Sequence, residues 1–300
     1  MKDIYRTPDS AFEQLPDYPF TPHYVEVDGL RMHYVDEGPQ DGPVVLMLHG
    51  EPTWSYLYRH MIGPVAEKGY RVIAPDLIGF GKSDKLTDIQ AYSYLRHVMW
   101  MKLFVERLAL ADITLVCQDW GSLIGLRLAA ENEERFAGLV VGNGFLPTGD
   151  DRVPPAFYLW RTFALYSPWF PVGRIVDAGC LRKLTAEELA AYDAPFPERP
   201  ALAGARAFPR LVPTAPNNAA TAANRAAWKV LERWQKPLVT CFGKQDPIFR
   251  GADTRLQEKV PGARGMPHQR VRAGHFIQED APDELVKAIL ACIESQSAAA

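Results

Sequence analysis

One carboxylate in this sequence stands where a nucleophile is expected. Asp119 follows the apolar and β-branched run 113–117 and precedes Trp120 and Gly121, where a helix that starts with small residues is expected. This strand–turn–helix context usually presents a serine in the pattern G-x-S-x-G, whereas here the pattern is C-x-D-x-G. A carboxylate attacks a carbon that bears a leaving group and forms an alkyl ester. The sequence therefore predicts displacement at carbon by Asp119 and excludes serine-type acyl transfer.

Two further residues complete a catalytic set. Asp246 comes just after the apolar run 238–242, and His275 follows the short run Gln269–Val271. In the α/β-hydrolases the nucleophile, the acid and the histidine follow each other along the chain in this order. We therefore predict His275 as the general base and Asp246 as the acid that orients it.

Other acids and histidines are weaker candidates. Asp150 and Asp151 lie beyond the turn that follows the run 139–142, and the residue directly after that run is Asn143. An amide cannot orient an imidazolium as a carboxylate can. His49 follows another apolar run, but a role in shaping its loop is the better interpretation than a role as base.

The loop after the apolar run Val44–Leu48 is expected to form part of an oxyanion hole. In this fold the loop supplies one backbone N–H, and the residue after the nucleophile supplies the second. The two donors are then the amides of Glu51 and Trp120. They would hold the oxyanion when water activated by His275 attacks the ester on Asp119, and losing one such donor typically costs about 10²–10³ in rate.

Apolar runs alternate with helical stretches along most of the chain, which predicts βαβ crossovers and a mostly parallel central sheet flanked by helices. This is the α/β class and the α/β-hydrolase fold. The runs are a hairpin at 23–36, strands at 44–48, 70–74, 113–117, 139–142, 238–242 and 269–271, and helices such as 92–109 and 122–130.

The alternation stops at about residue 145 and resumes near residue 219. Between these points Pro, Trp, Phe and Tyr are dense, and prolines interrupt the helical pieces. We interpret 146–216 as a helical cap domain inserted over the carboxyl ends of the strands, where such sheets bind ligands. The segments 1–145 and 217–300 then form the core domain.

The composition is that of an ordinary soluble enzyme: 300 residues, 47% hydrophobic and 23% charged, with a net charge of -3. It gives no basic surface for nucleic acid, and no apolar run approaches the about 20 residues that span a bilayer. The sequence 81–83 (Gly-Lys-Ser) is no P-loop, because Asp76 stands where the first glycine is required. Zinc spacing and dinucleotide signatures are absent, so we expect no metal and no cofactor.

The N-terminus lacks the apolar core of a signal peptide. The four cysteines are scattered, and two of them, Cys117 and Cys241, lie in expected buried strands. We therefore expect free thiols and a cytoplasmic location, with a disulfide as the alternative. We also expect a monomer.

Motifs spread along the chain resemble those of the haloalkane dehalogenases, and several of them the subfamily typified by the Xanthobacter enzyme. The resemblance runs from about residue 6 to residue 290 and implies hydrolysis of haloalkanes to alcohol and halide, with water as the second reactant and no cofactor. It also implies that Asp246 is the acid. The expected cap is shorter than in the type enzyme, so chain-length preference does not carry over. The motifs are 6–9, 34–38, 49–54, 118–121, 194–197 and 273–276.

A departing halide needs N–H donors in an apolar pocket. The indole of Trp120 is a donor without acceptor capacity. Other dehalogenase subfamilies have an Asn after His-Gly for this role, but here Glu51 stands there, and as a carboxylate it would repel the anion. The second donor is then expected in the cap. Trp160 lies in a Phe-x-x-Trp-basic run that resembles the subfamily, whereas Trp169 lies among prolines and is interpreted as packing.

A mainly apolar substrate pocket is expected between cap and core. The residues expected to line it are Phe157, Trp160, Phe208, Pro209 and Leu211 from the cap, and Leu123, Ile248 and Phe249 from the core.

Two alternative functions stay open at this point. An epoxide hydrolase shares the Asp nucleophile and protonates its leaving oxygen with cap tyrosines, for which Tyr158, Tyr166 and Tyr192 are candidates. Glu51 argues against it, because that family more often has Phe after His-Gly. A ligand-binding protein of this fold without turnover usually keeps the serine, so the complete catalytic set argues against that function.

Overall fold

The computed structural model describes residues 3–151, 153 and 155–297. Its centre is an eight-stranded sheet in the order β10-β9-β8-β7-β4-β5-β3-β2. Neighbours from β10 to β5 are parallel, while β3 is antiparallel to both β5 and β2. The mostly parallel sheet with one edge hairpin confirms the predicted fold class. The strands are β2 (His23–Val27), β3 (Leu30–Glu37), β4 (Val44–Leu48), β5 (Arg71–Pro75), β7 (Ile113–Gln118), β8 (Phe136–Gly142), β9 (Leu238–Gly243) and β10 (Gln269–Val271).

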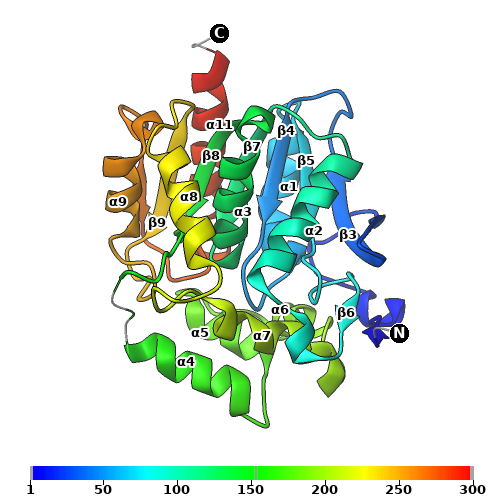
Figure 1. The fold of residues 1–300 in the computed structure, drawn as a ribbon. Helices are drawn as coiled ribbons and strands as arrows, with labels where there is room; N and C mark the ends of the chain where they lie inside the picture. Colours follow the sequence, from blue (N-terminus) through cyan, green and yellow to red (C-terminus); the bar gives the residue numbers. More distant parts are fainter. Residues whose placement is uncertain (1–2, 152, 154, 298–300) are drawn as a thin grey trace.

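Helices cover both faces of the sheet (Figure 1). On one face lie α2 (Tyr94–Arg107), α3 (Trp120–Glu131) and α8 (Thr221–Leu231), and on the other lie α1 (Arg59–Ala66) and α11 (Pro282–Ser297). Because β4 and β7 are covered on both sides, all their residues are buried. This explains why both strands appear in the sequence as continuous apolar runs rather than as alternating patterns.

Smaller elements connect these layers. Strands β1 (Ile4–Tyr5) and β6 (Lys85–Leu86) form a separate antiparallel pair, and α9 (Ala252–Lys259) packs against β9. The short helices are η1 (Asp9–Phe12), η2 (Ser55–Tyr58), η3 (Ile89–Ala91), η4 (Glu133–Arg135), η5 (Arg199–Leu202), η6 (Pro261–Ala263) and α10 (Ile277–Asp280).

Four helices form a separate layer at one end of the sheet, below the strands in Figure 1. They are α4 (Pro155–Tyr166), α5 (Val172–Gly179), α6 (Ala186–Asp193) and α7 (Ala203–Leu211). α4 packs on α7, and α5 packs on α6. We call them the helical layer. All four lie within the segment 146–216, whose boundaries as a domain stay a prediction.

The start of α6 shows how the sequence determines where these helices begin. Thr185 Oγ1 accepts a hydrogen bond from the Glu188 amide at 3.2 Å, and Glu188 Oε2 accepts one from the Thr185 amide at 2.8 Å. This reciprocal capping box satisfies two N–H groups that the first helical turn leaves free. Helix α5 instead begins directly after Pro171, whose ring fixes φ.

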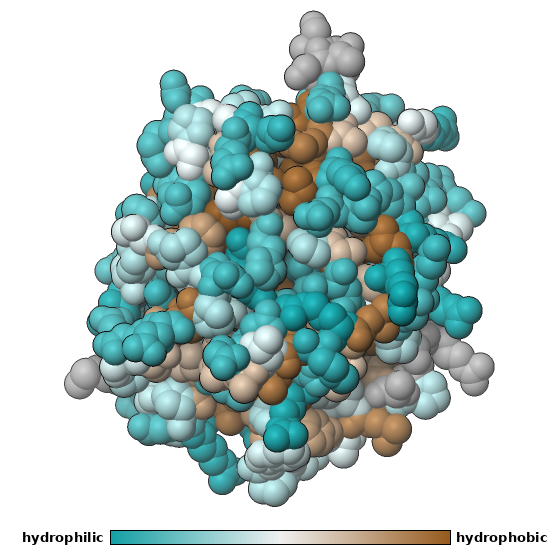
Figure 2. Space-filling model, turned by 180° about the vertical axis from the view of Figure 1, so that it is seen from behind, coloured by the Kyte–Doolittle hydropathy of each residue, from teal (hydrophilic) through white to brown (hydrophobic). Residues whose placement is uncertain are grey.

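The surface opposite the view of Figure 1 is mostly hydrophilic, and its hydrophobic side chains lie in separate areas (Figure 2). Such scattered apolar residues are normal on a globular protein. None of the helices in the described part of the chain has the length and hydropathy of a transmembrane span.

Candidate active site

Asp119 lies at the turn between β7 and α3 with φ 48° and ψ -126°. This conformation is strained for a residue with a side chain and is typical of functional turns. Two glycines make room for it. A Cβ on Gly50 would lie 2.4 Å from Cβ of Asp119, and a Cβ on Gly121 would lie 2.0 Å from the Leu48 carbonyl oxygen. The elbow therefore needs both glycines.

Two further residues predicted at the site lie beside Asp119. His275 Nε2 is 3.7 Å from Asp119 Oδ2, and His275 Nδ1 is 3.3 Å from Asp246 Oδ1. Asp246 is buried and also accepts a hydrogen bond from the Ile248 amide at 2.8 Å. The structure thus brings together three side chains that are far apart in the sequence. Asp150 and Asp151 instead form exposed ion pairs with arginines.

Both backbone amides expected in an oxyanion hole bind the Asp119 carboxylate. The Glu51 amide donates to Asp119 Oδ1 at 2.8 Å, and the Trp120 amide donates to the same carboxylate. Oδ1 is therefore held by the Glu51 amide, while Oδ2 faces His275. His49 does not reach this group, because its Nε2 accepts from the Leu77 amide at 2.9 Å, which agrees with a role in shaping the loop.

The site shifts the pKa of each ionisable group in it. Burial raises the pKa of Asp119 above its ordinary value, although His275 and the two amides act in the opposite direction. Burial lowers the pKa of His275, but the hydrogen bond and charge of Asp246, together with the Asp119 charge, raise it overall. Burial, followed by the Asp119 charge, holds the pKa of Glu51 well above its usual range.

The sequence analysis missed Gln118 and Asn143, which connect the loops of the site. Asn143 donates to the carbonyls of Gly274 and His275 at 2.7 and 2.8 Å, accepts from the Gly243 amide at 2.7 Å, and accepts at its own carbonyl from the Asp119 amide at 3.0 Å. Its place at the carboxyl end of β8 was the available signal.

Gln118 defines the proton position on the histidine. Its Nε2 lies 3.2 Å from His275 Nε2 and donates to the His275 carbonyl, also at 3.2 Å. A donor facing Nε2 favours the tautomer with its proton on Nδ1, next to Asp246. Nε2 then carries no proton, which is the state that a general base requires.

A cavity of about 910 Å³ lies between the sheet and the helical layer, with Asp119, Trp120 and His275 in its wall. Six residues predicted to line a pocket do line it: Leu123, Phe157, Trp160, Pro209, Ile248 and Phe249.

Two predicted pocket residues, Phe208 and Leu211, are not in the cavity wall. Phe208 is fully buried and stacks on Trp120, with ring centroids 4.4 Å apart. It therefore supports the indole from behind, while the next residue of the helix, Pro209, faces the cavity. Leu211 packs against the hydrophobic core. Successive helical residues point about 100° apart, so a run of apolar residues on α7 cannot all face one cavity.

The two candidate halide donors both reach this cavity. Trp120 and Trp160 line it, and within the described residues neither indole N–H donates to a protein acceptor. Trp169 lies outside its wall and is 62% exposed.

The chain matches the α/β hydrolase fold family over residues 43–282. It is 58% identical over 293 residues to the haloalkane dehalogenase of Mycobacterium marinum, which covers 96% of this chain and 99% of that one. It is 49% identical to the enzyme of the same name from Psychrobacter cryohalolentis, over 96% of this chain and 97% of that one. The chain belongs to the haloalkane dehalogenases. A solved tetrameric haloalkane dehalogenase from Paraglaciecola agarilytica superposes with a TM-score of 0.90 at 34% identity, covering 96% of this chain and 98% of that chain.

The dehalogenase is therefore a hydrolase that acts on carbon–halide bonds, with haloalkane and water as reactants and halide as product. The family and its reaction, predicted from the motifs, are confirmed. The epoxide hydrolase alternative is not favoured, and the cavity agrees with this. Tyr158, Tyr166 and Tyr192 are not among the residues that line it, and Tyr192 instead hydrogen-bonds to Glu279.

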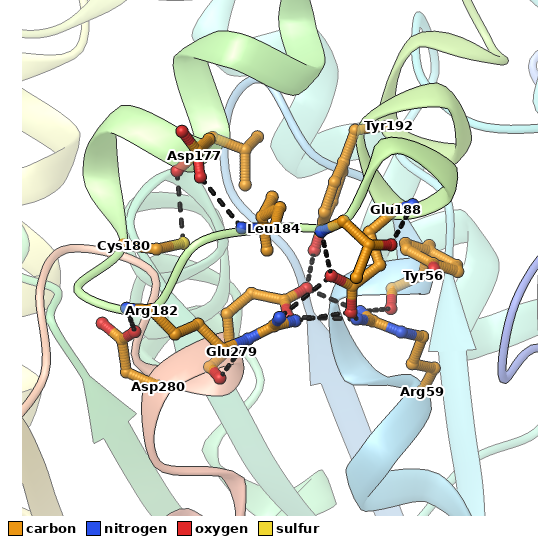
Figure 3. Close-up of polar contacts among 12 residues, drawn as sticks. Tyr56, Arg59, Asp177, Cys180, Arg182, Leu184, Glu188, Tyr192, Glu279 and Asp280 are labelled. Atoms are coloured by element: carbon orange, nitrogen blue, oxygen red, sulfur yellow. Dashed lines mark hydrogen bonds and ion pairs between the residues drawn. The ribbon is translucent and has the colours of Figure 1, made fainter.

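A buried ion network fastens the dehalogenase's helical layer to the core (Figure 3). Arg59 of α1 donates to both carboxylate oxygens of Glu279 at 2.6 and 3.0 Å and to Glu188 of α6 at 2.8 Å. Arg182 donates to Glu188 at 2.7 and 2.9 Å and also binds Glu279. Tyr192 donates to Glu279. Although burial raises the pKa of Glu279, Arg59 lowers it below the ordinary value.

The same network adjoins the loop that carries His275. Asp280, next to Glu279, accepts from the Gly274 amide at 2.7 Å and from the Leu181 and Arg182 amides at 2.9 Å. The His275 amide donates to the Gly179 carbonyl at 2.7 Å. The loop is thus bonded directly to the end of α5.

One group of side chains among the described residues has the spacing of a metal site. Ligand atoms of His60, Glu188 and Glu279 lie within 4.8 Å of one another. Both carboxylates, however, already bind the guanidinium groups of Arg59 and Arg182. Two positive charges in the group oppose a cation, so these residues do not fit a metal.

Proposed function

We propose that the dehalogenase works through a covalent ester on Asp119, with His275 as general base and Asp246 as the acid that orients it. The observation that carries this proposal is the position of the Asp119 carboxylate, between the Glu51 amide at 2.8 Å and His275 Nε2 at 3.7 Å. One group is thus held for attack, and a base is ready for the second step.

In the first step the Asp119 oxygen that faces the cavity attacks the carbon bearing the halogen. A carbon–oxygen bond forms while the carbon–halogen bond breaks, and the electron pair leaves with the halide. The negative charge moves from Asp119 to the halide. Trp120 and Trp160 then donate their indole N–H groups to the anion, and each charge-assisted hydrogen bond contributes about 1.5–3 kcal/mol.

In the second step His275 takes a proton from water, and the oxygen of that water attacks the ester carbonyl of Asp119. The Glu51 and Trp120 amides hold the resulting oxyanion. Collapse releases the alcohol, which takes the proton from His275. The second proton of the attacking water is then lost from the Asp119 carboxyl group to solvent, which restores the carboxylate. Asp246 stabilises the imidazolium that forms in between. A general base of this kind contributes about 10²–10⁴ to the rate.

The substrate is a haloalkane whose carbon chain fits a largely apolar cavity of about 910 Å³. Leu123, Phe157, Pro209, Ile248 and Phe249 surround it, and the segment 146–216 acts as the cap that excludes bulk water. The product is a primary alcohol. We further propose that the chain acts as a monomer in the cytoplasm and binds neither nucleic acid nor membrane; analytical ultracentrifugation tests the first point, since one relative is a tetramer.

Trapping the ester tests the mechanism. His275→Gln lacks the base and should accumulate the alkyl-enzyme when it is incubated with 1,2-dibromoethane. Mass spectrometry of the digested protein should then show an adduct on the peptide that contains Asp119, and Asp119→Ala should show none. An unmodified His275→Gln protein under saturating substrate, with active wild type, would overturn the mechanism. An adduct on another residue would do the same.

A further inference from the structure

The Glu51 side chain is a buried carboxyl group without a partner. The residue is 6% exposed and lies in the cavity wall next to Asp119. Its Oε1 has no hydrogen-bond partner in the described structure. Only the backbone amide of Glu51 has a role in the mechanism above, so the side chain is unexplained. A buried polar group that makes no hydrogen bond costs free energy, so such a group is expected to have a partner.

Glu51 and Asp119 are neighbouring acids in very different surroundings. Asp119 accepts two backbone amides and faces His275. The Glu51 carboxyl receives no such donor, and both burial and the Asp119 charge raise its pKa. When two carboxyl groups compete in this way, the one with the donors keeps the negative charge and the other keeps a proton. Glu51 is therefore the neutral member of the pair.

The other charged groups around the cavity do not reverse this order. Those that line it are Asp119, His275, Asp151, Arg250 and Arg255. Arg255 is bonded to Asp151 at 2.8 Å, and His275 to Asp246 at 3.3 Å, so both side chains already have acidic partners. Arg250 is exposed to solvent. The charge that acts on Glu51 most strongly is the negative charge of Asp119.

The displacement step transfers a negative charge from Asp119 to the halide in this cavity. Before displacement the charge is on Asp119, and after it Asp119 is a neutral ester and the halide carries the charge. A neutral carboxylic acid has one O–H to donate, whereas a carboxylate has none. A Glu51 side chain that keeps its proton therefore does not repel the halide and can donate a hydrogen bond to it.

We propose that the Glu51 carboxylic acid donates its O–H hydrogen bond to the departing halide, as a third donor beside the Trp120 and Trp160 indoles. The inference rests on the proposed function and deepens it. The proton stays on Glu51 throughout, so no bond to it breaks. Deprotonation at alkaline pH both removes a donor and adds a repelling charge next to the halide.

Bromide titration, followed by quenching of tryptophan fluorescence across a pH series, tests this. Glu51→Gln keeps an N–H donor and has no acidic proton. Glu51→Met has similar length and no donor. Every variant keeps the backbone amide at position 51. Gln245→Met removes an exposed amide from the same cavity wall and is the matched control.

We expect the bromide affinity of the wild type to fall at alkaline pH more than that of Glu51→Gln. Both proteins contain His275, so any fall caused by that residue is common to the two curves. Glu51→Met should bind bromide about tenfold more weakly than Glu51→Gln at neutral pH, because one hydrogen bond to a charged group is lost. Gln245→Met should bind as the wild type does.

Coincident pH curves for wild type and Glu51→Gln would overturn the inference, and so would a Glu51→Met protein that binds bromide like the wild type. If Glu51→Met does not fold, which circular dichroism shows, the pH comparison with Glu51→Gln still decides. Failure of the proposed function has a different signature, since His275→Gln would then form no ester on Asp119 in the trapping experiment.

Discussion

The two sides of the helical layer are attached to the core in contrasting ways. On the side of α5 and α6, Arg59 and Glu279 are fully buried and bonded to each other, to Glu188 and to Arg182. On the side of α4, the ion pairs nearest to the helix start are solvent-exposed, as in the pair of Arg255 with Asp151. Several large apolar side chains there also face solvent: Leu159 is 74% exposed, Tyr166 79% and Trp169 62%.

The two sides of the helical layer also contribute differently to the active site. The side of α5 and α6 carries the contacts to the loop of His275, where a displacement of the base would affect the chemistry. The α4 side contributes Phe157, Trp160 and Phe163 to the cavity wall. Regions with few buried contacts open at lower free energy than the core. We therefore expect α4 to move more readily than α5 and α6.

Removing Arg59 should have the largest effect. Arg59→Met removes the main partner of the buried Glu279 and one of the partners of Glu188, and truncating a buried ion pair costs about 3–5 kcal/mol. Urea unfolding followed by circular dichroism measures this. Lys183→Met is the matched control, because its pair with Asp177 is exposed and such pairs contribute about 0–1 kcal/mol. Equal losses in the two variants would contradict the contrast.

Trp160 on α4 should affect binding without a similar loss of stability. Trp160→Phe removes one N–H donor to the halide and should weaken bromide binding by about 1.5–3 kcal/mol. Fluorescence quenching and the rate of carbon–halogen cleavage report it. Trp169→Phe should leave both unchanged. If Trp169→Phe weakens bromide binding and Trp160→Phe does not, the assignment of Trp160 is wrong.

Weakening the contacts of Asp280, on the side of α5 and α6, should change the pH profile of kcat. The hydrolysis step needs neutral His275, so its rate falls as pH decreases through the pKa of His275, which Asp246 raises. Asp280→Asn weakens the bond to the Gly274 amide and should loosen the contact between His275 and Asp246. Burial then dominates, and the pKa of His275 falls. The acid limb of kcat should move to lower pH, and an unmoved limb would show that Asp280 does not position His275.

The smallest effect is expected on the outer surface of α4. Leu159→Ser exchanges a side chain that is 74% exposed and should change the free energy of unfolding by less than about 0.5 kcal/mol. Chemical denaturation measures it. A loss comparable to that of Arg59→Met would mean that another molecule covers this surface in solution, and sedimentation of both proteins would reveal that molecule.

The strands and the elbow could be predicted because their signals are local. Asp119, Asp246 and His275 each follow a short apolar run, and parallel strands bring such positions to one edge. The bond of Arg59 to Glu279 spans 220 positions, and no local pattern indicates it. Glu51 was assigned a charge from its residue type, whereas its surroundings decide the protonation state. Phe208 was misplaced because proximity on a helix does not give orientation.

The ion network also has a consequence for recombining members of this family. Arg59 and Glu279 are encoded outside the segment 146–216, while Arg182, Glu188 and Tyr192 are encoded inside it. In a chimera that receives a foreign cap without these three residues, Arg59 and Glu279 keep each other as partners but lose the bonds that come from the cap. Designs that graft new caps should therefore exchange the five residues as one set, and libraries that recombine them independently should contain many chains that fold poorly.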